Sequence, residues 1–257
     1  MKLPLIHSHL LGEIDGICHG FSTRAGGVSI GIFSSMNCGP FSGDDMASVT
    51  RNRGLISTKL NGYSLVTNRQ VHGNTVRVIG PDDDLEHVKE ADGIVTGETG
   101  ICIGALGADC APVLFADPEA MIIGVAHAGW QGALAGVTDA VVFAMEQLGA
   151  RRAAIRCCIG PAIQCQSYEV GEEFKEKILA VDPGQAERCF TTNSQSGKVH
   201  FDLPQYIESR LKASGIEQIE KCDHDTYSDA ERFFSYRRTC HEGENQYGRQ
   251  IGAICLS

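Results

Sequence analysis

Several features that define common protein classes are missing from this chain. No C-x2-C pair occurs, so the usual cysteine pattern of a zinc finger is absent. The net charge is −10, which argues against a general nucleic-acid binder, because that role requires a basic surface. No apolar run reaches the length needed to cross a membrane. We therefore expect neither nucleic acid nor a membrane among its partners.

The first residues, MKLPLIHSHLLGEIDG, also lack the uninterrupted apolar stretch of a signal peptide. The eleven cysteines are scattered and odd in number, which does not suit a disulfide framework. Most of them are expected to be small buried residues in a reducing compartment. A cytoplasmic location is the prediction that follows.

The composition is that of an ordinary globular protein. With 257 residues, 42% of them hydrophobic, the chain can form one large domain or two small ones. No internal repeat, low-complexity stretch or linker divides it. We therefore predict a single compact α/β (α+β) domain over residues 1–257, as a monomer or a weak dimer.

Apolar periodicity and turn residues predict the main elements. One helix is expected over residues 44–60, with Asp44 or Asp45 as its N-cap, and another over residues 132–148. Asp202 is the expected N-cap of a third helix. Strands are predicted in SLVTNRQVHGNTVRVIG, ICIGALG, APVLFAD, MIIGVAHAG, AAIRCCI, EQIEKCD, FFSYRR and QIGAICLS, and on either side of a long loop in GICHGFSTRAGGVSIGIFSSMNCGP.

Three residues lie in short motifs rich in small residues: His72 in QVHG, Cys110 in GADCAPVLFAD and His127 in VAHAGWQG. Two imidazoles and a thiolate can hold one zinc ion with its fourth position open. That is the pattern of a catalytic site, whereas structural zinc is usually closed by four protein ligands. Cys110 and His127 also fall where predicted strands end, the place where open α/β sheets build sites. Taken alone, each of these side chains is more often structural than a ligand.

The residues around these motifs have candidate roles as well. Gly107, Gly129 and Gly132 would let a ligand approach the backbone closely. Asp109, beside Cys110, is a candidate to orient an imidazole. The helix start after His127 could hold a phosphate or an oxyanion through its free N–H groups. The glycines of AGWQG fit equally well in a tight turn that serves packing alone.

The motifs FSTRAGGVS, QVHG, ADGIVT, GADCAPVLFAD, VAHAGWQG, IGPAIQCQSYEVG, FDLP and FFSYRR, in this order, resemble the YfiH family. Its members are also called multicopper polyphenol oxidoreductases or laccase-domain proteins. The resemblance covers residues 16–256 and implies mixed sheets packed between helices in a layered sandwich. It also implies a zinc ion bound by His72, Cys110 and His127. One departure is Gln131, because the family usually has an arginine at that position.

The resemblance also implies a choice of activities. Members of the family have been assigned phosphorolysis of purine nucleosides, including methylthioadenosine, and deamination of adenosine. Another assignment is a hydrolase that edits a peptidoglycan precursor. The laccase label refers to copper-dependent oxidation of phenols. The fold has further been likened to cysteine deamidase toxins, with the matched cysteine and histidine as a catalytic pair.

The chemistry of these reactions indicates which residues each would use. Phosphorolysis requires an anion site, for which Arg24 in its Gly-rich loop is the first candidate, followed by Arg237 and Arg249. Arg51 and Arg53 are further candidates, although an exposed solubilising charge is the more common role of such residues. Deamination requires an activated water, which an open zinc site supplies. In both reactions Cys110 is a metal ligand. In a cysteine hydrolase it would instead be a nucleophile, with His127 as its base.

We predict a zinc-dependent enzyme that acts on purine nucleosides, with nucleoside and phosphate as its partners. The alternatives, in order, are a peptidoglycan-precursor hydrolase, a cysteine hydrolase or copper-dependent polyphenol oxidase, and a zinc-binding module without catalysis. Copper is an alternative to zinc because a thiolate with two imidazoles can bind either metal. The predicted catalytic residues are His72, Cys110, His127, Asp109 and Arg24, and the predicted substrate contacts are Arg24, Gln131, Arg237 and Arg249.

Overall fold

Two large mixed sheets form the centre of the fold. The computed structural model describes residues 3–194 and 196–257, and these ranges contain three sheets and eight α-helices. The largest sheet has the strand order β13-β9-β7-β8-β5-β4. Its strands are β4 (Val76–Ile79), β5 (Gly93–Thr96), β7 (Ala111–Asp117), β8 (Ile122–Ala128), β9 (Arg156–Ile159) and β13 (Gln218–Lys221).

The second sheet has five strands in the order β1-β2-β14-β6-β3. It is mixed because β3 runs parallel to β6, whereas the other neighbours are antiparallel. Its strands are β1 (Leu5–Ile6), β2 (Ile17–Ser22), β3 (Ser64–Val66), β6 (Ile101–Gly107) and β14 (Gln250–Leu256).

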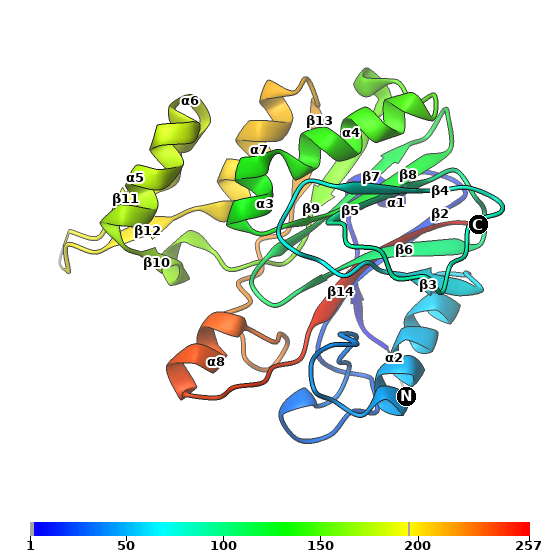
Figure 1. Ribbon diagram of the computed structural model, residues 1–257, viewed down its shortest axis with the longest axis horizontal. Coiled ribbons are helices and arrows are strands. Elements are labelled where there is room, and N and C mark those ends of the chain that lie inside the picture. The colour runs from blue at the N-terminus through cyan, green and yellow to red at the C-terminus, as the bar shows by residue number, and fades with distance from the viewer. Residues whose placement is uncertain (1–2, 195) are drawn as a thin grey trace.

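Helices cover the outer face of each large sheet, which gives four layers (Figure 1). Three buried apolar clusters fill the spaces between the layers. The first lies under α4 and α7, the second between the two sheets, and the third under α2. The covering helices are α3 (Trp130–Ala135), α4 (Val137–Gln147) and α7 (Leu203–Ala213) on the six-stranded sheet, and α2 (Met46–Lys59) on the five-stranded sheet.

Strand β7 shows why the central strands are continuous apolar runs in the sequence. Val113 and Phe115 belong to the cluster under the helices, whereas Leu114 and Ala116 belong to the cluster between the sheets. Successive side chains of a strand point to opposite faces, and here both faces are covered. The segment APVLFAD is therefore buried along its whole length.

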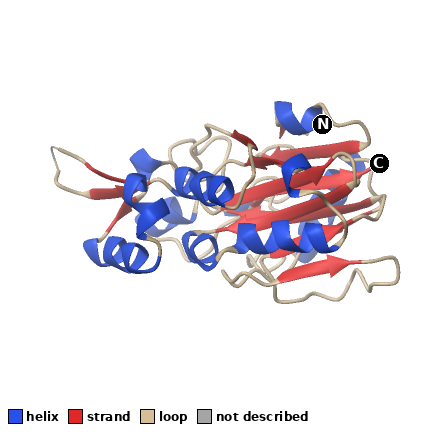
Figure 2. Ribbon diagram, turned by 90° about the horizontal axis from the view of Figure 1, so that it is seen from above, coloured by secondary structure: helices blue, strands red, loops and turns tan. Residues whose placement is uncertain are grey.

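A small three-stranded antiparallel sheet lies to one side of the two large sheets (Figure 2). Its order is β10-β12-β11, and α5 and α6 accompany it. Among the residues described, no helix is long and apolar enough to span a membrane. The remaining elements are β10 (Glu169–Val170), β11 (Phe190–Thr192), β12 (Val199–Phe201), α1 (His9–Gly12), α5 (Glu172–Val181), α6 (Pro183–Ala186) and α8 (Tyr236–Glu242).

Two predicted helix starts are confirmed by their caps. The carboxylate of Asp45 accepts the N–H groups of Ala47 and Ser48 at the start of α2. The carboxylate of Asp202 accepts the N–H of Gln205 at the start of α7. In each case a side-chain oxygen satisfies N–H groups that have no partner within the helix.

The single helix predicted over residues 132–148 is wrong. The structure has two helices there, α3 and α4, with Gly136 between them. Gly136 has a φ angle of 85°, in the left-handed region that glycine adopts readily. The chain therefore changes direction at Gly136, although the apolar periodicity continues through it.

Two predicted strands are also wrong. In FFSYRR, the hydroxyl of Ser235 accepts the N–H of Arg238 and caps the start of α8, so the segment ends in a helix. In residues 16–40, β2 is followed by a loop with a 3-10 turn at Gly31–Phe33 in place of the second strand. The remaining predicted strands have counterparts in the two large sheets.

Candidate metal centre

His72, Cys110 and His127 lie together at one end of the six-stranded sheet. Their candidate ligand atoms are all within 4.8 Å of one another. Cys110 directly precedes β7, and His127 is near the end of β8. Because Ala111 pairs with Ala128, the antiparallel register places Cys110 close to that end. His72 comes from the loop between β3 and β4, so three separate segments bring the predicted ligands together.

Asp92 fixes two of these three residues. Its carboxylate lies 2.8 Å from Nδ1 of His127 and accepts the backbone N–H groups of Val71, His72 and Gly73 at 2.8–3.1 Å. The side chain is fully buried. Because Nδ1 of His127 is engaged by Asp92, Nε2 is the nitrogen left to bind a metal. A carboxylate in this position is the usual partner of a metal-binding imidazole.

Asp109 has other partners than the imidazole that we predicted for it. Its carboxylate accepts hydrogen bonds from the hydroxyls of Thr226 at 2.7 Å and Ser235 at 3.0 Å, and from the N–H of Arg237 at 2.6 Å. Burial raises the pKa of this carboxyl group, although the hydrogen bonds oppose the shift. Asp109 therefore ties the turn before Cys110 to the segment that carries Arg237, and the contact with the imidazole belongs to Asp92.

Cys110 and His127 shift each other's pKa. Burial raises the pKa of the Cys110 thiol, but the charge of His127 and hydrogen bonds from both imidazoles outweigh it and lower the pKa to about 6. Burial lowers the pKa of His127, but the charge of Cys110 and the hydrogen bond to Asp92 raise it to about 9. Without metal, the pair is therefore a thiolate beside an imidazolium at neutral pH. The thiolate is the form of cysteine that binds metal.

A thiolate should accordingly be observed in metal-free protein at neutral pH. A lowered pKa means that Cys110 ionises as the pH rises through about 6, and not through its ordinary value of 9.0. The ultraviolet absorbance of the thiolate, titrated in wild-type protein and in Cys110→Ala, isolates this group as the difference between the two curves. A difference curve with its midpoint near the ordinary value would contradict the prediction.

The residues of the cluster fit a metal ion. At Gly129, a Cβ atom would lie 2.8 Å from Sγ of Cys110 and 2.9 Å from Nδ1 of His72, so glycine leaves the space that these two atoms occupy. Any larger residue would push them out of place. Two imidazole nitrogens and one thiolate sulfur form a donor set that suits zinc and also copper.

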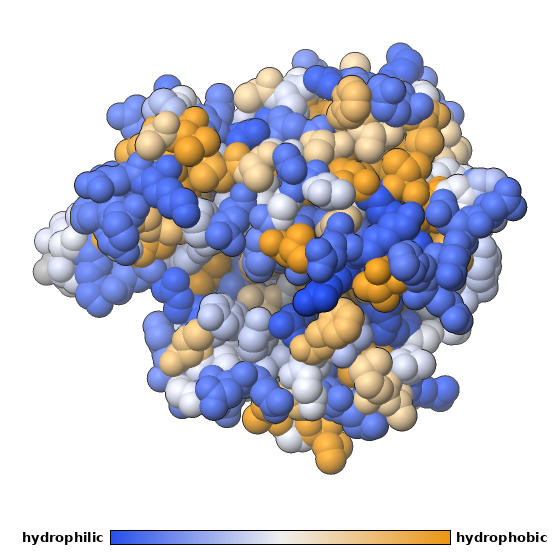
Figure 3. Space-filling view, in the orientation of Figure 1, coloured by the Kyte–Doolittle hydropathy of each residue, from blue (hydrophilic) through white to orange (hydrophobic). Residues whose placement is uncertain are grey.

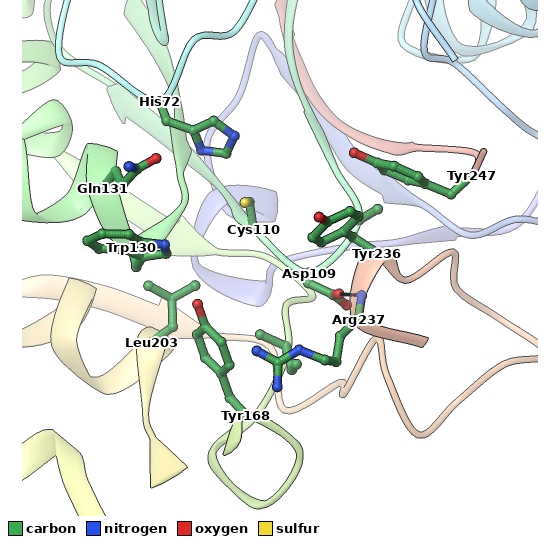
Figure 4. Close-up of a pocket in the computed structure, with 12 residues that line it drawn as sticks. His72, Asp109, Cys110, Trp130, Gln131, Tyr168, Leu203, Tyr236, Arg237 and Tyr247 are labelled. Carbon is green, nitrogen blue, oxygen red and sulfur yellow. Dashed lines mark hydrogen bonds between the residues drawn. The ribbon is translucent and has the colours of Figure 1, made fainter. Parts of the chain in front are cut away.

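Cys110 and His72 also line a cavity of about 440 Å³, which we call the aromatic hollow (Figure 4). The surface view shows a depression between the lobe of α5 and the segment of α8 (Figure 3). Trp130 is the only tryptophan of the chain. Because the rings are apolar on their faces and polar at their edges, the hollow suits a planar heterocycle. Its aromatic residues are Trp130, Tyr168, Tyr236 and Tyr247.

Two of the predicted substrate contacts line this hollow. Gln131 reaches it from α3. The guanidinium of Arg237 lies over the ring of Tyr168, 5.1 Å from its centroid, and donates a hydrogen bond to the carbonyl of Glu169 at 2.7 Å. The structure therefore brings Gln131 and Arg237 to the same cavity as Cys110.

The other two predicted arginines lie elsewhere. Arg249 lines a smaller cavity of about 110 Å³ on which His72, Cys110 and His127 also border. Arg24 is outside both cavities. Its guanidinium donates to the carbonyls of Ser34 at 2.9 Å and Ala230 at 3.0 Å and lies over the ring of Phe234. These contacts fix the Gly-rich loop, so the structure does not bring Arg24 to the cluster.

Sequence reasoning missed Asp92 and the aromatic residues of the hollow. Asp92 lies in ADGIVT, directly before a buried strand. An acidic residue at the start of a buried strand is the one feature of the sequence that could have marked it as a site residue. Tyr168, Tyr236 and Tyr247 come from separate loops and from the start of α8, so no local pattern connects them. Trp130 could have been found from its place in AGWQG, next to a predicted ligand.

A cluster of two histidines and a cysteine at the end of a sheet, open to a cavity with aromatic walls, is typical of an enzyme active site. Residues 18–257 match the family model described as multi-copper polyphenol oxidoreductase laccase, so this chain belongs to that family. The resemblance to YfiH proteins is confirmed by the solved structures as well. The chain is similar to the Bacillus licheniformis hypothetical protein YfiH, with a TM-score of 0.85 and 29% identity over 94% of this chain and 93% of the other.

Other relatives extend the comparison over nearly the whole chain. A protein of Neisseria meningitidis of known structure has a TM-score of 0.86 and 28% identity, with full coverage of both chains. A purine nucleoside phosphorylase of Corynebacterium glutamicum is 35% identical over 92% of this chain and 93% of its own length. A purine nucleoside phosphorylase of Streptomyces coelicolor is 36% identical over 95% of this chain and 97% of its own length.

Proposed function

We propose that this protein is a metal-dependent enzyme that cleaves purine nucleosides with phosphate, and that residues 1–257 act as one catalytic domain. The observation that carries the proposal is the cluster of His72, Cys110 and His127 in the wall of the aromatic hollow. At about 440 Å³, this cavity has the size of small-molecule sites. Relatives named purine nucleoside phosphorylase support the proposal.

The walls of the hollow indicate how the substrate would bind. A purine ring has two flat faces, and stacking of a base on an aromatic side chain contributes about 1–3 kcal/mol per base. Trp130 and Tyr168 offer such faces. Arg237 is held by the carbonyl of Glu169 and retains further N–H donors, and Gln131 offers both a donor and an acceptor. We therefore propose that the purine binds against these rings, with its polar edge toward Arg237 and Gln131.

The metal centre would lie beside the bound sugar. We propose zinc, held by His72, Cys110 and His127, which would supply a Lewis acid next to the substrate. Asp92 orients His127 and holds the loop of His72, and Gly129 leaves room for the ligand atoms. The same site is proposed to deaminate adenosine. A cytoplasmic location accompanies the proposal, because the cysteines are free thiols, the state that a reducing compartment maintains.

One observation favours a second candidate, a cysteine hydrolase. The thiol of Cys110, the imidazole of His127 and the carboxylate of Asp92 follow one another as nucleophile, base and orienting acid do in such enzymes. A hydrolase of this kind would keep its activity when metal is removed. The proposed metal-dependent enzyme would lose it.

Product analysis by mass spectrometry tests the proposal. Zinc-loaded protein is incubated with adenosine, inosine or methylthioadenosine, with and without phosphate, beside protein stripped of metal. Free base and a sugar phosphate, formed only with both phosphate and metal, are the expected result. Inosine formed from adenosine without phosphate would show the deaminase activity. No product from any nucleoside, with metal fully bound, would contradict the proposal.

A further inference from the structure

We propose that the anionic co-substrate, phosphate, binds in a second cavity beside the cluster, with Arg249 as its main cation. We call this cavity the arginine hollow. It has a volume of about 360 Å³, and the residues that matter here are Gly39, Phe41, Arg69, Gln70 and Arg249. The inference rests on the proposed function, since phosphorolysis is the reaction that needs this anion.

The arginine hollow is joined to the metal cluster. The smaller cavity of about 110 Å³ shares Gln70 and Arg249 with the arginine hollow. It shares His72, Cys110 and Tyr247 with the aromatic hollow. The three cavities therefore follow one another, with the cluster at the junction. In Figure 4, Tyr247 lies across Cys110 from Trp130 and Tyr168.

Arg249 is held firmly at the junction. Its backbone N–H donates to Oδ1 of Asn37 at 2.9 Å, and its carbonyl accepts the N–H of Cys38 at 3.0 Å. The methylene stem packs on Gly39, where a Cβ atom would lie 3.1 Å from Cδ of Arg249. The guanidinium lies over the ring of Tyr247, 4.4 Å from its centroid, and Nη2 donates to the Tyr247 hydroxyl at 3.0 Å. An arginine fixed in this way loses little side-chain freedom when it binds an anion.

The positive charge of Arg249 is also free to attract an anion. In residues 3–194 and 196–257, no carboxylate forms an ion pair with it, so Nε and Nη1 can donate to an anion. Arg69 lies at the exposed rim of this cavity, but Glu90 pairs with it at 3.5 Å and offsets its charge, so Arg249 is the main cation. Guanidinium groups bind phosphate through charge-assisted, bidentate hydrogen bonds. The chemistry of this cavity therefore suits phosphate.

The order of the cavities matches the geometry of the reaction. In phosphorolysis, an oxygen of hydrogen phosphate forms a bond to C1′ of the sugar while the bond from C1′ to the purine nitrogen breaks. The bonding electron pair leaves with the purine, which takes up the proton of the hydrogen phosphate. For an in-line displacement, the phosphate and the purine must lie on opposite sides of C1′. A purine in the aromatic hollow and a phosphate beside Arg249 satisfy this requirement.

Arg237 is less suited to hold the phosphate. It lines the aromatic hollow itself, with its guanidinium over the ring of Tyr168. A phosphate bound there would lie on the same side of the sugar as the purine. We therefore assign Arg237 to binding the polar edge of the purine, and Arg249 to binding the attacking phosphate.

Calorimetric titration with inorganic phosphate, without nucleoside, tests the inference directly. Zinc-loaded and metal-free protein should both bind phosphate, and Arg249→Gln should weaken binding by about tenfold or more in each, because it removes charge-assisted hydrogen bonds. Gly39→Ala should weaken binding in the same direction by displacing the stem of Arg249. Arg151→Gln is the matched control, since it removes the same charge from an exposed site that pairs with Glu119.

The nucleoside serves as an independent probe. Quenching of the fluorescence of Trp130 by inosine should be the same in Arg249→Gln as in wild type, because Trp130 lines the aromatic hollow and neither of the two cavities that Arg249 lines. In turnover, Arg249→Gln should raise KM for phosphate and leave KM for the nucleoside unchanged.

Three outcomes would overturn the inference. In the first, wild-type protein binds no phosphate. In the second, Arg249→Gln and Gly39→Ala both bind phosphate as tightly as the control variant does. In the third, phosphate binding depends on the metal alone. If wild-type protein binds phosphate through Arg249 but cleaves no nucleoside, the anion site stands and the proposed function fails.

Discussion

Cys110→Ala should leave the protein with little bound metal and lower turnover of nucleosides by at least about 100-fold. The substitution removes the thiolate and leaves two imidazoles, and even the loss of an outer partner of a metal ligand costs about 10–100-fold in affinity or activity. Cys110 as a residue is only partly buried and lies outside the three apolar clusters, so the fold should survive. Metal content after dialysis, initial rates with phosphate and a thermal unfolding curve measure the three effects.

The metal content of Cys110→Ala decides whether Cys110 acts as a metal ligand or as a nucleophile, and two further variants serve as its controls. Cys18→Ala removes a partly buried thiol in β2, outside the cavities that border on the cluster, and should behave as wild type. Gly129→Ala keeps the thiol but puts a methyl group 2.8 Å from its sulfur, so it should also weaken metal binding. If Cys110→Ala keeps its metal and loses turnover, the thiol is a nucleophile, and the cysteine hydrolase becomes the better assignment.

Elements fixed by local interactions could be predicted from the sequence. The caps of α2 and α7 are made by Asp45 and Asp202 with N–H groups two or three residues away, so a short window contains the whole signal. Strand β7 is buried throughout, and it is apolar as far as Ala116, because both of its faces are covered. The break at Gly136 was missed because one left-handed residue does not alter the apolar periodicity on either side of it.

FFSYRR shows the limit of local patterns. Its aromatic residues favour a strand, and Phe233 and Phe234 are indeed buried. The conformation is set by Ser235, which caps α8 and donates its hydroxyl to Asp109, a residue distant in the sequence. No strand signal within the segment could have revealed that contact.

The choice between Asp109 and Asp92 illustrates the same limit in the site. Asp109 adjoins Cys110 in the sequence, which made it the natural candidate to orient an imidazole. It has a φ angle of 90°, and its carboxylate bonds to Thr226 and Ser235. Asp92 reaches His127 through the pairing of β5 with β8, in which Gly93 lies opposite Ala126. Register between strands distant in the sequence therefore decides which carboxylate meets the cluster.

Asp92→Asn should weaken metal binding by about 10–100-fold, the usual cost of losing an outer partner of a metal-binding histidine. It should also lower the free energy of unfolding by about 1–3 kcal/mol. One carboxylate oxygen of Asp92 faces His127 and the N–H of His72, and the other accepts the N–H groups of Val71 and Gly73. An asparagine can keep only one of these two acceptor sides. Either the imidazole or the loop of His72 then loses its partner.

The effect of Asp92→Asn should depend on pH. Burial raises the pKa of Asp92, but the hydrogen bond and charge of His127 and the loop N–H groups outweigh it and lower the pKa below its ordinary value. A lowered pKa means that the carboxylate stabilises the fold at neutral pH and that this contribution is lost as the pH falls through the folded-state value. Wild type and variant should therefore differ most in unfolding free energy at neutral pH and converge in acid.

Asp83→Asn is the matched control for this prediction. It removes the same charge from a carboxylate that likewise accepts a backbone N–H, that of Gly80 at 2.8 Å, but on an acidic loop away from the cluster. Metal affinity should be unchanged in this control. If Asp92→Asn binds metal as tightly as the control does, Asp92 only stabilises the fold. The cluster would then owe its geometry to the packing of β7, β8 and Gly129 alone.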